Sequence, residues 1–164
     1  PRRHPRGARM SRLAVAVATF GYVGFFPIAP GTAGSLAALV LYAFVRWVGL
    51  PAFDLVMVVA VLVVGVWSAS LTERALDQKD PGPIVIDEVL GMLITLMWLP
   101  LSLGGVVAGF LLFRIFDIVK PYPAARMESL KGGLGVMLDD AVAGVYGHLA
   151  LRGLLLVAPS WLGA

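Results

Sequence analysis

The sequence predicts an all-α fold: a polytopic membrane helical bundle with four to five membrane helices and a short N-terminal interfacial or re-entrant helix. Of its 164 residues 59% are hydrophobic and 14% are charged, against roughly 45–50% and about 25% in soluble domains. The apolar residues are also gathered into runs near the roughly 20 residues that a helix needs to cross a hydrocarbon core. Too few polar residues remain to cover a water-soluble surface of this size.

The N-terminal residues 1–12 carry five arginines and precede an apolar run at 13–26. Basic residues beside a membrane segment favour the cytoplasmic side and attract anionic headgroups, so 1–12 is predicted to be a basic cytoplasmic tail. The run at 13–26 is short, which favours an interfacial or re-entrant segment. A cleaved signal peptide is the alternative, because "AVAVA" has small residues at a cleavage-like spacing, although they fall inside the apolar run.

The rest of the chain contains five candidate membrane helices. The fourth is short, so four or five helices are expected to span the membrane. All five belong to one predicted catalytic domain at 13–158, which is followed by a C-terminal tail at 159–164. The predicted helices are 34–50, 52–71, 84–103, 104–118 and 140–158.

The basic residues predict the orientation of this bundle. Eleven of the thirteen Lys and Arg residues lie in the tail, in the intervals 72–83 and 119–138, or at Arg114. The exceptions are Arg46 and Arg152. By the positive-inside rule the tail and both intervals face the cytoplasm.

Acidic residues then converge on the cytoplasmic face. Asp87 and Glu88 begin the third predicted helix, Asp117 ends the fourth, and Asp139 and Asp140 begin the last. An acid within a membrane segment costs about 2.5–3.5 kcal/mol, which favours a functional role. The alternative is that acids simply favour helix N-termini. That would explain Asp87 or Asp139 singly, but neither Asp117 at a helix C-terminus nor two adjacent pairs of anions that repel each other.

The donor set predicts a hard divalent cation, Mg²⁺ or Mn²⁺ as a substitute. The chain has no cysteine, and its two histidines, His4 and His148, are far apart. Thiolate sites and a clustered imidazole site are therefore excluded. The predicted metal ligands are Asp87, Glu88, Asp117, Asp139 and Asp140.

Two glycine-containing loops predict phosphate binding from the same face. "APGTAGSL" (29–36) opens the first long helix, with Thr32 as its expected N-cap and Gly31 beside it, so that its backbone amides face an anion. An ordinary proline–glycine turn is the alternative. "KGGLG" (131–135), which contains Gly133, is a second donor-rich loop.

Two basic residues flank Asp117 at three-residue spacing, Arg114 before it and Lys120 after it. All three share a face if the helix continues that far, although Pro121 indicates that it ends at Lys120. Arg114 either contacts the phosphate or extends to the lipid headgroups.

A phosphate, a divalent cation and a membrane face together indicate phosphoryl chemistry on a lipid. A cysteine phosphatase is excluded, neither His4 nor His148 qualifies as the nucleophile of a histidine-type lipid phosphatase, and there is no Asp-x-Asp pair. Metal-assisted hydrolysis remains, with water or an aspartate as the nucleophile. A transporter or channel for a cation is the alternative, but it would place acids near the bilayer midplane. The basic residues form no stripe between aromatics, so no nucleic-acid partner is predicted, and no feature predicts an oligomeric state.

Four segments, "PIAPGTAGSLAA", "IVIDEVLGM", "FRIFDIVKPYP" and "GGLGVMLDDAVAG", together resemble the phosphatidylglycerophosphatase A family from about Gly21 to Gly147. The departures, "ESLK" before the last segment and the arginine-rich tail, touch no acid. The resemblance implies Mg²⁺-dependent hydrolysis of phosphatidylglycerophosphate to phosphatidylglycerol in a bacterial inner membrane, with membrane lipids as its surroundings and the site facing the cytoplasm. It implies the site residues Thr32, Asp87, Glu88, Arg114, Asp117, Lys120, Asp139 and Asp140.

The expected roles combine this resemblance with the analysis of the acidic residues and the two glycine-containing loops. The expected catalytic residues are Asp87, Asp139, Asp140 and Lys120. The expected phosphate-binding residues are Gly31, Thr32, Arg114, Lys120 and Gly133.

Overall fold

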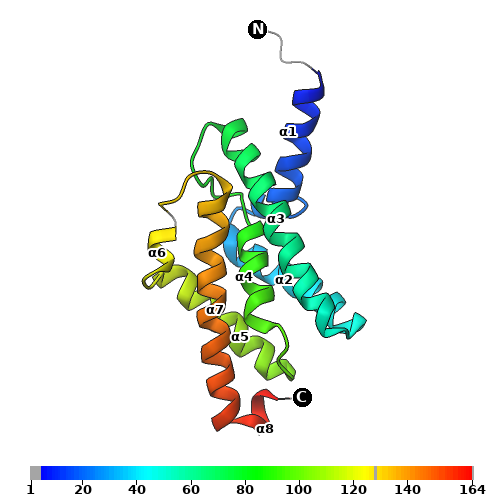
Figure 1. Ribbon diagram of the computed structural model, residues 1–164, viewed down its shortest axis with the longest axis vertical. Coiled ribbons are helices and arrows are strands. Elements are labelled where there is room, and N and C mark those ends of the chain that lie inside the picture. Colours follow the sequence, from blue (N-terminus) through cyan, green and yellow to red (C-terminus); the bar gives the residue numbers. More distant parts are fainter. Residues whose placement is uncertain (1–4, 128, 164) are drawn as a thin grey trace.

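A computed structural model describes residues 5–127 and 129–163 of the chain, and Figure 1 shows it. The described residues form helices and no strand, which confirms the all-α prediction. In order, the elements are α1 (Pro5–Ala18), the 3₁₀ helix η1 (Val23–Phe25), α2 (Pro30–Val48), α3 (Pro51–Leu76), α4 (Ile86–Leu96), α5 (Leu103–Val119), α6 (Ala124–Met127), α7 (Gly133–Val157) and α8 (Pro159–Leu162).

Three helices, α2, α3 and α7, are long and apolar enough to cross a membrane. The longer helices after α1 run in alternating directions: α2, α4 and α7 descend in Figure 1, whereas α3 and α5 ascend. The start of α2, the start of α4, the end of α5 and the start of α7 therefore all lie toward the same end of the bundle. This is the arrangement that the sequence predicts for its acidic residues.

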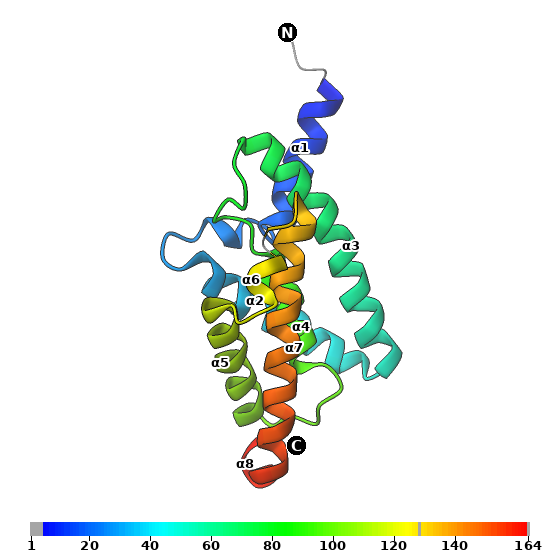
Figure 2. The ribbon, with the colours of Figure 1, turned by 60° about the vertical axis from the view of Figure 1, so that its left-hand side comes forward.

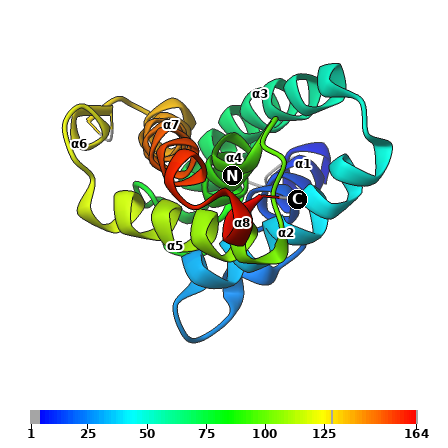
Figure 3. The ribbon, with the colours of Figure 1, turned by 90° about the horizontal axis from the view of Figure 1, so that it is seen from below.

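Helix α4 is shorter than predicted and lies at the centre of the bundle. It ends at Leu96 rather than at residue 103, because Leu99 precedes Pro100 and the residue before a proline disfavours helical backbone. Nine of its eleven residues are buried, and it contacts α2, α3, α5 and α7. Figure 3, a view along the long axis, shows α4 inside these four helices. It is a core helix rather than a lipid-facing one.

Helix α7 begins seven residues earlier than predicted, at Gly133 rather than at residue 140, so Asp139 ends its second turn and Asp140 begins its third. Its contact with α4 is close because glycines face each other there. A Cβ added at Gly144 would lie 2.6 Å from the carbonyl oxygen of Gly91. Small residues allow two helices to approach in this way, which brings the acids of α4 and α7 together.

The terminal segments are more ordered than predicted. Helix α1 begins at Pro5, inside the expected tail, and the run at 13–26 is divided between α1 and the turn that follows it. The Val85 N–H donates to the Ala18 carbonyl at 3.0 Å, which ties this turn to the start of α4. At the other end the expected tail forms α8, where the Ser102 N–H donates to the Leu162 carbonyl at 2.9 Å.

Candidate active site

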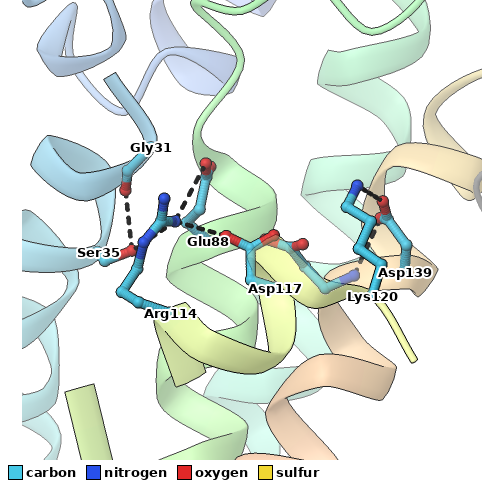
Figure 4. Close-up of polar contacts among 8 residues, drawn as sticks. Gly31, Ser35, Glu88, Arg114, Asp117, Lys120 and Asp139 are labelled. Carbon is cyan, nitrogen blue, oxygen red and sulfur yellow. Dashed lines mark hydrogen bonds and ion pairs between the residues drawn. The ribbon is translucent and has the colours of Figure 1, made fainter. Parts of the chain in front are cut away.

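Most of the predicted site residues lie together between the start of α2 and helices α4, α5 and α7. Figure 4 shows Glu88 from α4, Arg114 and Asp117 from α5, Lys120 just after α5 and Asp139 from α7 directed toward one region. The site lies inside the bundle, at the end where α2, α4 and α7 start and α5 finishes. It divides into a carboxylate cluster, two ion pairs and a helix N-terminus.

The carboxylate cluster consists of Asp87, Glu88 and Asp140. Each offers one carboxylate oxygen, and these oxygens all lie within 4.8 Å of one another. Asp87 is 9% exposed and Asp140 is 3% exposed. Asp87 Oδ1, Glu88 Oε2 and Asp140 Oδ2 are buried and have no hydrogen-bond partner among the residues that the structure describes. Three buried anions so close together repel one another and have lost their hydration, and a cation between them would offset both costs.

Oxygen donors of this kind fit a hard divalent cation, and each of the three carboxylates has one buried oxygen without a hydrogen-bond partner in the described part of the chain. Asp87, Glu88 and Asp140 would hold it. The remaining two predicted ligands, Asp117 and Asp139, are engaged with basic side chains instead.

Arg114 is the cation beside the cluster. Its Nη1 donates to Asp117 Oδ2 at 2.5 Å and lies 3.8 Å from Glu88 Oε1. The same atom lies 3.4 Å from Ser35 Oγ on α2. Its side chain is 17% exposed, so it points into the site and not out to the headgroups. Arg114 therefore links α2, α4 and α5 and offsets part of the negative charge.

Asp139 and Lys120 form the second ion pair, on the side of α7. Lys120 Nζ lies 2.6 Å from Asp139 Oδ2, and Asp139 is 3% exposed. Helix α5 ends at Val119, and Lys120 has left-handed backbone with a φ of 45°. The ending that Pro121 predicts is therefore confirmed, and it places Lys120 opposite α7 rather than on the face of α5 that carries Arg114.

The start of α2 approaches the cluster closely. A Cβ added at Gly31 would overlap Glu88 Oε1 and lie 3.2 Å from Arg114 Nη1. Thr32 is not the N-cap as predicted: the cap is Ala29, with Pro30 at the first position, and Thr32 lies inside the first turn. First-turn amides have no partner within their helix, so the N–H groups of Gly31 and Thr32 are the donors at this end of α2.

Gly133 does not belong to this set. Its N–H donates to Ser70 Oγ at 2.9 Å, and a Cβ added there would lie 2.8 Å from the backbone nitrogen of Ser70 on α3. The amide predicted to bind phosphate is therefore engaged with Ser70 and is not used in the proposal below. Gly133 instead allows the start of α7 to pack against α3.

Ser35 was not predicted and contributes to the site. Its hydroxyl donates to the Gly31 carbonyl at 2.8 Å and lies within reach of Arg114. The sequence feature that could have identified Ser35 is its spacing of four residues from Gly31, which places both residues on one face of α2.

The close approach of Gly31 gives a steric prediction. Gly31→Ala should displace Glu88 or Arg114 and lower kcat/KM for the phosphate ester hydrolysis that the sequence predicts by about 100-fold, the scale of a misplacement near 1 Å. Gly82→Ala is the matched control, because a Cβ at Gly82 meets nothing within 4 Å. Steady-state phosphate release by the two variants checks this, and equal activity would mean that the approach of α2 has no catalytic role.

Comparisons with known proteins agree with the resemblance in the sequence. The family model described as Phosphatidylglycerophosphatase A matches residues 16–155. A Bacteroides thetaiotaomicron protein provisionally named phosphatidylinositol-3-phosphatase is 42% identical over 87% of this chain and 94% of its own. Phosphatidylglycerophosphatase A of Escherichia coli is 41% identical, over 74% of this chain and 72% of its own.

The phosphatidylglycerophosphatase A of Haemophilus influenzae is 37% identical, over 75% of this chain and 77% of its own. No solved structure shows a significant match. The matched segment includes the carboxylate cluster, both ion pairs and the start of α2. The chain therefore belongs to the phosphatidylglycerophosphatase A family of phosphatases.

Proposed function

We propose that the protein is a Mg²⁺-dependent lipid phosphate monoesterase that hydrolyses phosphatidylglycerophosphate to phosphatidylglycerol and phosphate. The observation that carries this is the cluster of Asp87, Glu88 and Asp140, in which Glu88 Oε1 lies beside Arg114 and the start of α2. Acidic metal ligands next to anion donors suit a phosphate ester. The names of two relatives support the choice of lipid.

The cluster carboxylates hold the cation in this proposal. A divalent cation bound there would supply Lewis-acid stabilisation of negative charge on the phosphoryl group. Arg114 and the first-turn amides of Gly31 and Thr32 bind phosphoryl oxygens and fix the orientation of the group.

Lys120 acts at the leaving group. Asp139 holds its ammonium through the 2.6 Å contact, and Lys120 Nζ donates to the glycerol oxygen as the bond from phosphorus to that oxygen breaks. The new bond to phosphorus comes from water, which gives phosphate directly, or from a cluster carboxylate, whose acyl phosphate is then hydrolysed by water to release phosphate and restore the carboxylate. Asp87 and Asp140 are the candidates for the second route, because Asp139 is engaged with Lys120.

Phosphatidylinositol 3-phosphate is the alternative candidate substrate, since one relative is provisionally named as a phosphatase for it. Purified protein in detergent should be assayed for phosphate release from phosphatidylglycerophosphate, phosphatidylinositol 3-phosphate and phosphatidic acid. We expect the first to be hydrolysed fastest and none to be hydrolysed in excess EDTA. Release without a membrane gradient argues against the transporter alternative. Faster hydrolysis of the inositol lipid would reassign the substrate, and no release from any lipid would refute the proposed function.

We also propose that the protein lies in the bacterial inner membrane with this site facing the cytoplasm. The sequence has no cysteine, so single cysteines report topology without background. In sealed right-side-out vesicles, a membrane-impermeant maleimide should label Leu50→Cys, in the turn between α2 and α3, but not Gln78→Cys, which follows α3. Opening the vesicles should allow Gln78→Cys to react. The reverse pattern would place the site outside and contradict the charge bias.

A further inference from the structure

A groove lies at the end of the bundle opposite the candidate active site. It is bounded by the C-terminal half of α7, the turn at 97–102 and α8, which lie together in Figure 2. Its volume is about 630 Å³. The walls are mostly apolar, and the residues that the argument uses are Trp98, Leu99, His148, Arg152, Leu155 and Pro159.

Arg152 gives the groove a positive charge, and no acidic residue lines it within the described part of the chain. Arg152 is exposed on a helix long enough to span the membrane, and within the described residues it forms no ion pair. His148 lies four residues earlier on the same face of α7, and its Nδ1 is buried without a hydrogen-bond partner among those residues. A basic residue in a membrane segment is costly unless an anion or a headgroup accompanies it. The groove therefore complements an anion.

Three of the four tryptophans lie exposed at the groove's end of the bundle, and the fourth, Trp67, is 40% exposed on α3. Trp47 is 82% exposed, Trp98 is 53% exposed and Trp161 is 80% exposed. They come from the end of α2, the turn after α4 and α8, which all lie at this end of the bundle. Tryptophan is enriched where the hydrocarbon meets the headgroups, so this end of the bundle lies toward that interface, which the long side chain of Arg152 can approach.

The groove is distinct from the carboxylate cluster. Arg152 follows Asp140 by twelve residues on the same helix, a separation of about 18 Å at the rise of an α-helix. A lipid bound at one site would not occupy the other with its phosphate.

We infer that this groove is a second lipid site, which binds an anionic phospholipid of the leaflet opposite the active site. Its phosphate contacts Arg152 and His148, while its acyl chains lie along Leu99, Leu155 and Pro159. Basic pockets between membrane helices bind anionic headgroups in this way, and a guanidinium matches the geometry of a phosphate.

Native mass spectrometry of the detergent-purified protein tests the inference. With equimolar phosphatidylglycerol and phosphatidylcholine added, the wild type should retain phosphatidylglycerol preferentially. Arg152→Gln should reduce that retention about fivefold or more, the factor expected for one lost basic contact. Arg152→Lys should restore part of it. Ser160→Trp, which fills the groove without changing its charge, should reduce retention independently. Arg126→Gln is the matched control, since Arg126 is exposed on α6 at the other end.

The active site also accommodates a lipid, so Arg114→Gln is compared in parallel. The inference requires that Arg114→Gln leave the retained phosphatidylglycerol in place while Arg152→Gln reduces it about fivefold or more. Loss in Arg114→Gln alone would assign the lipid to the active site and overturn the inference. Equal retention of the two lipids, or unchanged retention in both Arg152→Gln and Ser160→Trp, would also overturn it. None of these readouts requires catalytic activity.

Discussion

Asp140→Asn is expected to abolish most phosphate release, with kcat about 1,000-fold lower or more. Asp140 is 3% exposed and contributes one of the three oxygens that lie within 4.8 Å of one another. An amide removes one negative charge and leaves a weaker donor at the same position, so a divalent cation would bind less tightly and its Lewis acidity would be lost. The shape of the side chain is kept, so the bundle should still fold.

The measurement is phosphate release from phosphatidylglycerophosphate together with thermal unfolding in detergent. Asp77→Asn is the matched control: Asp77 is exposed just after α3 and has left-handed backbone, which asparagine tolerates. That variant should keep wild-type activity. If Asp140→Asn turned over at the wild-type rate, the cluster would have no part in the reaction.

Arg114→Lys should lower kcat/KM by about 100-fold or more, the cost of removing one donor that stabilises developing charge. The guanidinium is planar and carries five donors, so one side chain contacts Asp117, approaches Glu88 and Ser35, and retains donors for a phosphate. A lysine keeps the charge but not this fork. The decrease in kcat/KM should therefore come from poorer orientation of the phosphoryl group, because the net charge of the site is unchanged.

Steady-state kinetics distinguish this from a general loss of stability. Arg126→Lys makes the same chemical change on exposed α6 and should leave both kcat and KM unchanged. Wild-type kcat/KM in Arg114→Lys would show that a point charge is sufficient there, and Arg114 would then only neutralise the surrounding acids.

The gathering of the acids was predictable from the sequence because it depends on chain direction alone. Short polar intervals make successive helices run in opposite directions. Acids at the start of one helix and at the end of the previous helix therefore reach the same end of the bundle. Proline and glycine also marked some boundaries correctly: Lys120 before Pro121 ends α5 as predicted.

The pairings within the site were not predictable, because they depend on the rotation and packing of the helices. Asp139 and Asp140 are adjacent in sequence, yet the first binds Lys120 and the second joins Asp87 and Glu88. The same limit explains Gly133: its sequence resembles an anion-binding loop, but contact with Ser70 on α3 decides its role. Hydropathy likewise extended α4 to residue 103, because a buried core helix and a spanning one are equally apolar.

Electron paramagnetic resonance of Mn²⁺ added to the purified, metal-free protein tests the central claim most directly, since it reports the metal site without requiring turnover. The wild type should bind Mn²⁺ saturably, and Mg²⁺ should displace it. Combined replacement of the cluster (Asp87→Asn, Glu88→Gln and Asp140→Asn) should remove that binding, while Asp77→Asn should retain it. Saturable binding that survives the triple replacement, or no saturable binding to the wild type, would contradict the assignment of Asp87, Glu88 and Asp140 as the metal site.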